Sequence, residues 1–395
     1  MYRKNTLMLS LKEYFLLEPS IIFLNHGSYG AAPRPVFEAY QAWQRRLEQQ
    51  PVLFLGREFN GFMQEARRAL GEYLNTPADH LVYIPNATHG LNIVARSLAL
   101  KPGEEILTSD HEYGACDYTW EVVCEKTGTK YIHQPIALPV QTEDEILEQF
   151  WQGATPRTRV IYLSHITSST ALRLPVERIC QRAREAGILS IIDAAHAPGQ
   201  IRVDLLQLGA DIVFGNCHKW MMAPKGSAFL YARPEIQNLI EPLVVSWGYH
   251  ATPDIATGSA FVDFLQWTGT RDPSAFLAVP EAIRFMEEHH WDEVRGECHN
   301  LLRQAIERIC ELTSMLPLYP LDSDLYSQMG IAPLPRSDLV TLKCRLYDEF
   351  HIEVPLTECQ DRQFIRISIQ GYNSQADVDA LLHALRTLLP EVRVP

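Results

Sequence analysis

The stretch that decides the fold reads ILSIIDAAHAPGQIRVDLLQLGADIVFGNCHKWMMAPKGSAFLYA and occupies residues 188 to 232. It contains short apolar runs at 188 to 193, 211 to 215 and 227 to 232. Runs of this length without regular polar positions are typical of strands that are buried on both faces of a sheet. We therefore predict neighbouring strands of one sheet, each followed by a polar or glycine-containing turn.

Similar runs lie further out, at LVYI (81 to 84) and VIYL (160 to 163), and stretches with helical spacing such as VERICQRAREAG separate the runs. This alternation predicts an α/β fold with a mainly parallel sheet. In such folds, functional side chains gather beyond the carboxyl ends of the strands.

The pattern changes after about residue 260. Two amphipathic helices, AFLAVPEAIRFMEEH and ECHNLLRQAIERICELT, precede the strand-like pieces SDLVTLK and FIRISI and a last helix, QADVDALLHALRTLL. We expect an N-terminal arm (1 to 20) that packs as a short amphipathic helix, a large domain (21 to 262) and a smaller α+β domain (263 to 395).

Composition narrows the classes of partner. The formal net charge of -13 at pH 7 repels a polyanion, and no run of Lys and Arg offsets it, so we expect no nucleic-acid partner. No apolar stretch is long enough to span a membrane, and the first 20 residues lack a cleavage site, so we expect a cytoplasmic protein. The eight cysteines are scattered, without a C-x-x-C pair, and indicate neither a zinc site nor a disulfide framework.

Two ionisable residues follow the deciding strands, Asp193 after one run and Lys219 after the next. A buried strand end is a costly place for an unpaired charge, since desolvation costs several kcal/mol per ion. Two interpretations are open on this evidence. The two side chains form an ion pair with each other, or each pairs with a bound pyridoxal 5'-phosphate (PLP), Asp193 at the ring nitrogen and Lys219 at the aldehyde carbon.

The chain also resembles a known family. The segments FLNHGSYGAAP, NATHGLN, DHEYGA, SHITSSTAL, DAAHAPG, NCHKW, WTGTRDPS and RISIQGYN are similar, in the same order, to those of the class V aminotransferase family. The likeness covers residues 21 to 373. It implies the PLP-dependent fold type I, PLP as cofactor, an amino-acid substrate and a homodimer with composite active sites.

The resemblance also implies roles for single residues. Lys219 matches the lysine that forms the imine with PLP, Asp193 the partner of the pyridine nitrogen, and Tyr113 the residue that stacks on the ring. His196 and Ser168 match positions that meet the phenolic oxygen. Arg366 and Asn25 match the substrate side, where Gly27 and Gly30 permit close backbone approach.

A phosphate site is predicted where NATHGLN opens a helix after a strand, because the backbone N–H groups of Ala87 and Thr88 and the Thr88 hydroxyl would face an anion there. Helix capping by Asn86 predicts the same side chains and stays an alternative. By resemblance, Asn216 and His218 lie on the phosphate side, and Thr270 reaches the phosphate from a neighbouring subunit.

The reaction stays open among several possibilities. Desulfurases of the family carry a nucleophilic cysteine where FHIEVPL places Ile352, so the resemblance disfavours persulfide chemistry, although Cys359 lies nearby. The segments are most similar to the branch of isopenicillin N epimerase-like proteins. We therefore expect epimerisation at Cα, with a C–S lyase as the first alternative, an aminotransferase as the second, and a non-catalytic PLP-binding regulatory module as an interpretation of another class.

Overall fold

The computed structural model describes residues 11–252 and 256–394. Its largest feature is a seven-stranded sheet in the order β2-β8-β7-β6-β5-β3-β4. The strands are β2 (Leu81–Ile84), β3 (Glu105–Ser109), β4 (Lys130–Gln134), β5 (Thr158–Ser164), β6 (Leu189–Asp193), β7 (Ile212–Asn216) and β8 (Ala228–Ala232). Strands β7, β6, β5, β3 and β4 run parallel, and β8 is antiparallel to both of its neighbours. The α/β fold with a mainly parallel sheet is thus confirmed.

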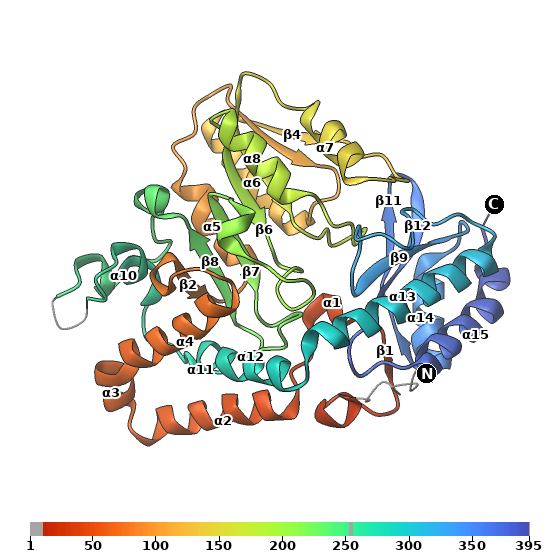
Figure 1. Cartoon of the computed structure of the whole chain (residues 1–395), viewed down its shortest axis with the longest axis horizontal. Coiled ribbons are helices and arrows are strands. Elements are labelled where there is room, and N and C mark those ends of the chain that lie inside the picture. The colour runs from red at the N-terminus through yellow and green to blue at the C-terminus, as the bar shows by residue number, and fades with distance from the viewer. Residues whose placement is uncertain (1–10, 253–255, 395) are drawn as a thin grey trace, which may run out of the picture.

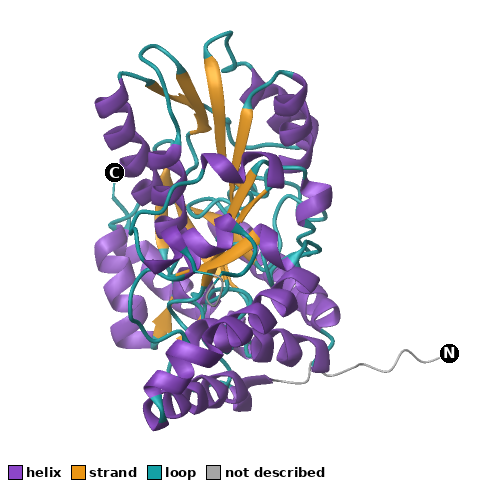
Figure 2. Cartoon of the chain, turned by 90° about the vertical axis from the view of Figure 1, so that its left-hand side faces the viewer, coloured by secondary structure: helices purple, strands orange, loops and turns teal. Residues whose placement is uncertain are grey.

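Helices cover both faces of this sheet, as Figure 2 shows. Successive residues of a strand alternate between the faces, so Ile192 packs in one core, with α4 and α8, and Ile191 in the other, with α5 and α6. The helices that precede residue 289 are α1 (His26–Tyr29), α2 (Arg34–Gln49), α3 (Pro51–Leu53), α4 (Phe59–Tyr73), α5 (Ala87–Ser97), α6 (Gly114–Thr127), α7 (Glu143–Trp151), α8 (Val176–Glu185), α9 (Leu205–Leu208), α10 (Ala260–Gln266), α11 (Ser274–Leu277) and α12 (Val279–Glu288).

The C-terminal part forms a smaller layer to the right in Figure 1. Its antiparallel sheet has the order β11-β12-β9 and is built from β9 (Met329–Leu334), β11 (Leu356–Cys359) and β12 (Arg362–Ser368). The long helix α13 (Trp291–Thr313) leads from α12 to this sheet and packs on β9, and α14 (Leu339–Phe350) and α15 (Gln375–Val392) pack together. The boundary predicted near residue 263 falls inside α10 and stays a prediction.

The N-terminal segment joins the two parts. Strand β1 (Ile22–Phe23) pairs in parallel with β10 (Ile352–Glu353), and the backbone N–H of Ser368 donates to the carbonyl of Leu24. The loop that follows β1 therefore lies between the small sheet and the large one.

The prediction of a strand at SDLVTLK is wrong, because residues 339 to 350 form helix α14. The Asp338 side chain caps this helix by accepting hydrogen bonds from the N–H groups of Val340 and Thr341, while Leu342 and Leu346 are buried one turn apart. An alternating pattern over a few residues cannot outweigh a good cap and a buried helical face. Of the predicted N-terminal helix, residues 1 to 10 lie outside the described residues, and Leu11–Tyr14 form a single 3-10 turn.

Candidate active site

The carboxylate of Asp193 ends strand β6 and lies in the interior, 4% exposed. Its Oδ1 accepts the N–H of Ala195 at 2.7 Å, and the Tyr162 hydroxyl donates to Oδ2 at 3.3 Å. Burial raises the pKa of Asp193, and the nearby Lys219 charge opposes this. A buried carboxylate of this kind is stabilised when a cation lies beside it.

The amine of Lys219 lies in the turn after β7, and Nζ is 3.0 Å from Nε2 of His196. Burial lowers the pKa of Lys219 to about 8, while Asp193 acts in the opposite direction. The charges of Lys219 and Asp193 each shift the pKa of the other group, yet no ion pair joins the two side chains among the described residues. This removes the interpretation in which they form a simple ion pair with each other.

The loop that follows β1 contacts the backbone of Lys219 and His218. His26 donates from Nε2 to the carbonyl of Lys219 at 3.0 Å. Gly30 has φ +67°, and a Cβ there would lie 2.1 Å from the carbonyl oxygen of His218, so only glycine fits. The predicted close approach of Gly30 concerned the substrate side and stays a prediction, whereas the contact seen here explains how a loop 193 residues away in sequence touches the lysine turn.

The N-terminus of α5 lies against the end of β7. Asn86 caps the helix by accepting the N–H of His89, so the capping interpretation is confirmed for this residue. The Ala87 N–H was predicted to face an anion, but it donates instead to Oδ1 of Asn216 at 2.9 Å, which ties these two predicted phosphate-side residues together. Thr88 is half-buried at the same helix end, and within residues 11–252 and 256–394 neither its N–H nor its hydroxyl donates a hydrogen bond. This helix end has the geometry of an anion site.

His218 lies in the same turn as Lys219, and its Nδ1 donates to the carbonyl of Ser227 at 3.1 Å. Burial lowers the pKa of His218 to about 4, so the ring is neutral at physiological pH. Its Nε2 is therefore a hydrogen-bond acceptor, or a donor only in acid.

The guanidinium of Arg366, on strand β12, is 6% exposed and has only neutral partners among the described residues. Its Nη1 donates to the carbonyl of Ser168, Nη2 donates to Oγ of Ser28 at 3.0 Å, and Nε has no hydrogen-bond partner in the part of the chain that the structure describes. Burial lowers the pKa of Arg366 to about 10, which leaves it charged at neutral pH. A buried charge without a counter-ion is costly, and a guanidinium fork suits a carboxylate.

Asn25 reaches this arginine indirectly. The Ser28 hydroxyl donates to Oδ1 of Asn25 at 2.5 Å, and the Asn25 amide donates to Oε1 of Glu353 at 2.9 Å. Sequence reasoning missed Ser28, whose only signal was its place inside FLNHGSYG.

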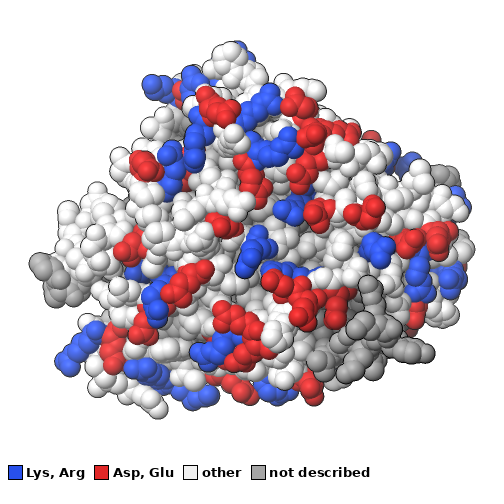
Figure 3. Space-filling view, viewed as in Figure 1, with Lys and Arg blue, Asp and Glu red and all other residues white. Residues whose placement is uncertain are grey.

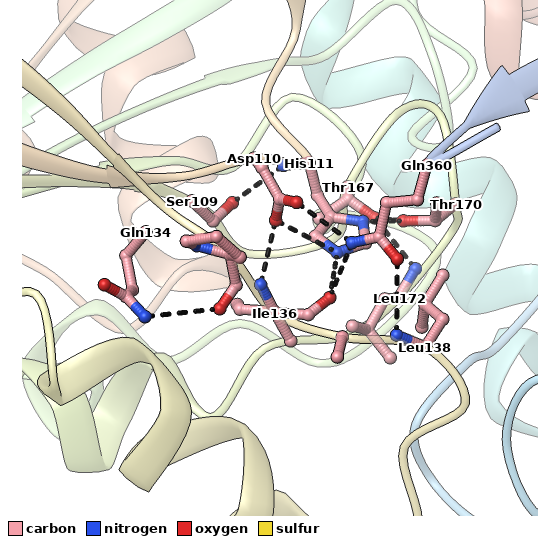
Figure 4. A network of polar contacts seen from close by, with 12 residues as sticks. Ser109, Asp110, His111, Gln134, Ile136, Leu138, Thr167, Thr170, Leu172 and Gln360 are labelled. Atoms are coloured by element: carbon pink, nitrogen blue, oxygen red, sulfur yellow. Dashed lines mark hydrogen bonds and ion pairs between the residues drawn. The ribbon is translucent and has the colours of Figure 1, made fainter.

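Tyr113 precedes α6 and is 49% exposed. The turn before it is fixed by the network in Figure 4, in which Nε2 of His111 donates to the carbonyl of Ile136 at 2.8 Å and Nδ1 is 2.9 Å from the Thr170 hydroxyl. Gln360, from the turn between β11 and β12, donates to Asp110 at 2.9 Å in the same network. His111 is thus a structural residue that holds the backbone in front of Tyr113.

Glu112 is a residue of the site that sequence reasoning missed. Although the residue as a whole is half-buried, its carboxylate accepts hydrogen bonds from Oγ of Ser109 and from N and Oγ of Ser164, at 2.6 to 2.9 Å. Burial raises the pKa of Glu112 to about 8, and the charge of Asp193 contributes to the rise. Ser164 pairs with Asp193 in the sheet, so Glu112 lies at the same strand ends as the other site residues.

Thr270 is a predicted site residue that the described part of this single chain does not connect to the others. It is exposed and follows α10. Its predicted role concerns a neighbouring subunit and stays a prediction.

The arrangement meets the requirements of PLP. The buried, pKa-raised carboxylate of Asp193 suits the pyridine nitrogen, the Lys219 amine suits the aldehyde end, the N-terminus of α5 suits the phosphate, and Arg366 offers a charge for a substrate carboxylate. Fold and site together define a PLP-dependent enzyme of fold type I.

Comparisons with known proteins identify the family. The model of the protein family described as aminotransferase class V matches residues 22–331 of this chain. The chain is 35% identical over 390 residues to the isopenicillin N epimerase of Amycolatopsis lactamdurans, covering 95% of this chain and 97% of that protein. It is 26% identical over 407 residues to a probable chloroplastic L-cysteine desulfhydrase of Arabidopsis thaliana, covering 94% of this chain and 84% of that protein. The chain belongs to the class V aminotransferase family, and PLP is its cofactor.

The fold agrees with solved structures. The complex of the cystine C–S lyase C-DES with its product cysteine persulfide superposes with a TM-score of 0.80 at 21% identity, over 93% of this chain and 98% of that one. This likeness concerns the fold.

Surface features add two observations. No helix in the described part of the chain is long and apolar enough to cross a membrane. On the face shown in Figure 3, Lys and Arg side chains are interspersed with Asp and Glu and do not form a continuous basic track.

Proposed function

We propose that this enzyme epimerises an amino-acid substrate at Cα. The observation that carries the proposal is the 35% identity to an isopenicillin N epimerase over 97% of that protein's length. The buried guanidinium of Arg366, which lacks a carboxylate partner among the described residues, supports an amino acid as the substrate.

The side chains of the site support proton transfer at Cα. When bound, PLP supplies an electron sink for the pair left on Cα. The Lys219 amine, with its pKa lowered to about 8, can remove the Cα proton near neutral pH once it is free. Arg366, held by Ser28 and Ser168, would orient the carboxylate, and Asp193 would hold a proton at the ring nitrogen.

We further propose that Tyr113 stacks on the ring and that His196 and Ser168 meet the phenolic oxygen. Tyr113 is exposed enough to contact a ligand, and Nε2 of His196 lies beside the Lys219 amine. Thr88 and Asn216 would bind the phosphate, with Asn216 orienting the first turn of α5 through the Ala87 N–H. His218, on the same side, would donate to the phosphate only when its ring is protonated.

Persulfide chemistry is not supported by the cysteines near the site. Ile352, at the place where desulfurases carry their cysteine, is buried in β10 and pairs with β1. Burial raises the pKa of the Cys359 thiol to about 11, so it is not a thiolate at neutral pH. The thiolate is the nucleophilic form, which argues against a desulfurase.

A C–S lyase is the second candidate. It is favoured by the similarity to L-cysteine desulfhydrases over 84% of the length of one of them. Removal of the Cα proton is common to both reactions, and a leaving group at Cβ turns the same site toward elimination.

The test is to incubate the PLP-loaded protein with a panel of L-amino acids in D2O. Epimerisation predicts α-deuteration with appearance of the D-isomer on chiral chromatography and no keto acid. Pyruvate with sulfide would identify the lyase, transfer of the amino group to a keto acid the aminotransferase, and no spectral change with any amino acid the regulatory module.

We also propose a homodimer in which Thr270 contributes to the partner's site. An exposed apolar stretch, Val244, Val245, Trp247 and Tyr249, lies shortly before Thr270 in the sequence and supports a covered surface there. Mixed dimers of Thr270→Ala and Lys219→Ala subunits would contain one intact site and should recover activity that neither parent has. A sedimentation mass of one chain would contradict the proposal.

A further inference from the structure

The residue that follows the lysine, Trp220, contacts His196. Trp220 is fully buried, and its indole N–H donates to Nδ1 of His196 at 3.2 Å. The other ring nitrogen of His196, Nε2, lies 3.0 Å from Nζ of Lys219. His196 is therefore bound on one side by Trp220 and on the other by the group that reacts.

The chemistry of these donors decides where the histidine proton lies. An indole N–H can only donate, so Nδ1 of His196 must be the acceptor. A neutral imidazole has one N–H and one acceptor nitrogen, which leaves the proton on Nε2. Nε2–H then points at Nζ of Lys219, and this bond requires the lone pair of an unprotonated amine.

The surrounding charges keep His196 neutral. Burial lowers the pKa of His196 well below its usual range, Arg366 and His218 act in the same direction, and so does Lys219 whenever its amine is protonated. The nearby carboxylate of Asp193 accepts its hydrogen bonds from Ala195, Tyr162 and Cys116, and not from the His196 ring. The doubly protonated imidazolium is thus disfavoured by burial and by charge.

The orientation of Trp220 is tightly determined. Its ring packs against His26 with centroids 5.1 Å apart. Gly199 has φ +91°, and a Cβ at this position would lie 2.2 Å from the carbonyl oxygen of Trp220. The close approach of these backbones fixes the turn from which the indole reaches His196.

We propose that Trp220 is a positioning residue that holds His196 as the Nε2–H tautomer, so that the histidine presents a hydrogen-bond donor to the phenolic oxygen of the cofactor. The inference rests on PLP binding at Lys219 but not on which reaction follows. Trp220 acts on catalysis only through His196. A hydrogen-bond donor at the phenolic oxygen favours the unprotonated form of the lysine-bound cofactor.

The decisive measurement is the tautomer itself. In cofactor-free protein labelled with 15N-histidine, at pH 9, couplings to the ring C–H protons distinguish Nε2–H from Nδ1–H, and the His196→Gln variant assigns the signal. The wild type should show Nε2–H. Trp220→Phe keeps most of the ring and removes the N–H, so the signal should shift to Nδ1–H or to a mixture.

A second measurement uses the loaded enzyme. The pH midpoint of its visible absorbance change should rise by about one pH unit in Trp220→Phe, since losing a hydrogen bond to a charged oxygen has roughly that effect. Trp291→Phe is the matched control, because the buried Trp291 indole N–H donates to the carbonyl of Gly199 at 3.1 Å and not to His196. Its midpoint should equal that of the wild type.

Different results would overturn this inference and the proposed function. Nδ1–H in the wild type would overturn the inference without any substitution, and so would an unchanged tautomer and midpoint in a folded Trp220→Phe. If the chain bound no PLP, the proposed function would fail, while the cofactor-free spectrum would still decide the tautomer.

Discussion

Replacing Arg366 with glutamine should abolish recognition of the substrate carboxylate. The structure gives this guanidinium two neutral contacts, to Ser28 and Ser168, and no anion among the described residues. A bidentate contact supplies two charge-assisted hydrogen bonds, each worth about 1.5 to 3 kcal/mol. Since about 1.4 kcal/mol corresponds to a factor of ten, kcat/KM should fall roughly 10²- to 10⁴-fold.

The fold should survive this change. The Arg366→Gln substitution would remove a desolvated charge that lacks a counter-ion, so the lost hydrogen bonds and the lost desolvation cost offset each other. We expect a Tm within about 3 °C of the wild type.

The assay compares α-deuteration of an amino acid with that of the corresponding amine, which lacks the carboxylate. The wild type should prefer the amino acid strongly, and Arg366→Gln should lose that preference. Arg362→Gln is the matched control, since Arg362 lies exposed at the start of the same strand. Retained preference in Arg366→Gln, or equal loss in Arg362→Gln, would refute the reasoning.

The other predictions concern the cofactor and its surroundings. Lys219→Ala should bind PLP without the visible band of a lysine-bound cofactor, and borohydride should then fix no cofactor, whereas the exposed Lys130→Ala should behave as the wild type; a label on another lysine would contradict this. Because the pKa of Glu112 is raised from 4.5 to about 8, its contribution to stability is present below pH 4.5 and is lost as the pH rises through about 8. Glu112→Gln should therefore flatten the fall in Tm between pH 5 and 9 by about a few degrees, as thermal unfolding would show, and an unchanged slope would argue against a raised pKa. Cys359→Ser should change the rate of α-deuteration less than about twofold, because the thiol is not ionised at neutral pH, and a large loss would revive persulfide chemistry.

Two residues of the site could be predicted from their positions in the sequence. Asp193 and Lys219 were found because each follows an apolar run that could only be a buried strand, and the sheet indeed places β6 beside β7. The same logic failed for SDLVTLK, where a strand-like alternation of a few residues lies inside helix α14. Strands β3 and β4 were not predicted at all.

Other members of the site carry no local signal. Glu112 depends on Ser164, 52 residues away, and Arg366 depends on Ser28, 338 residues away. The indole N–H of Trp220 can hold the His196 ring only because the fold places His196 beside it.

The sequence by itself determined five of the seven strands of the large sheet, several of the helices and the two groups that end neighbouring strands, because hydrophobic periodicity and capping act over a few residues. The tertiary structure alone decided that Arg366 is buried without an anion among the described residues, that Glu112 lies beside Asp193 and that His196 is bound from both sides. These are properties of distant segments brought into contact, and burial, which shifts each pKa, exists only once the chain has packed.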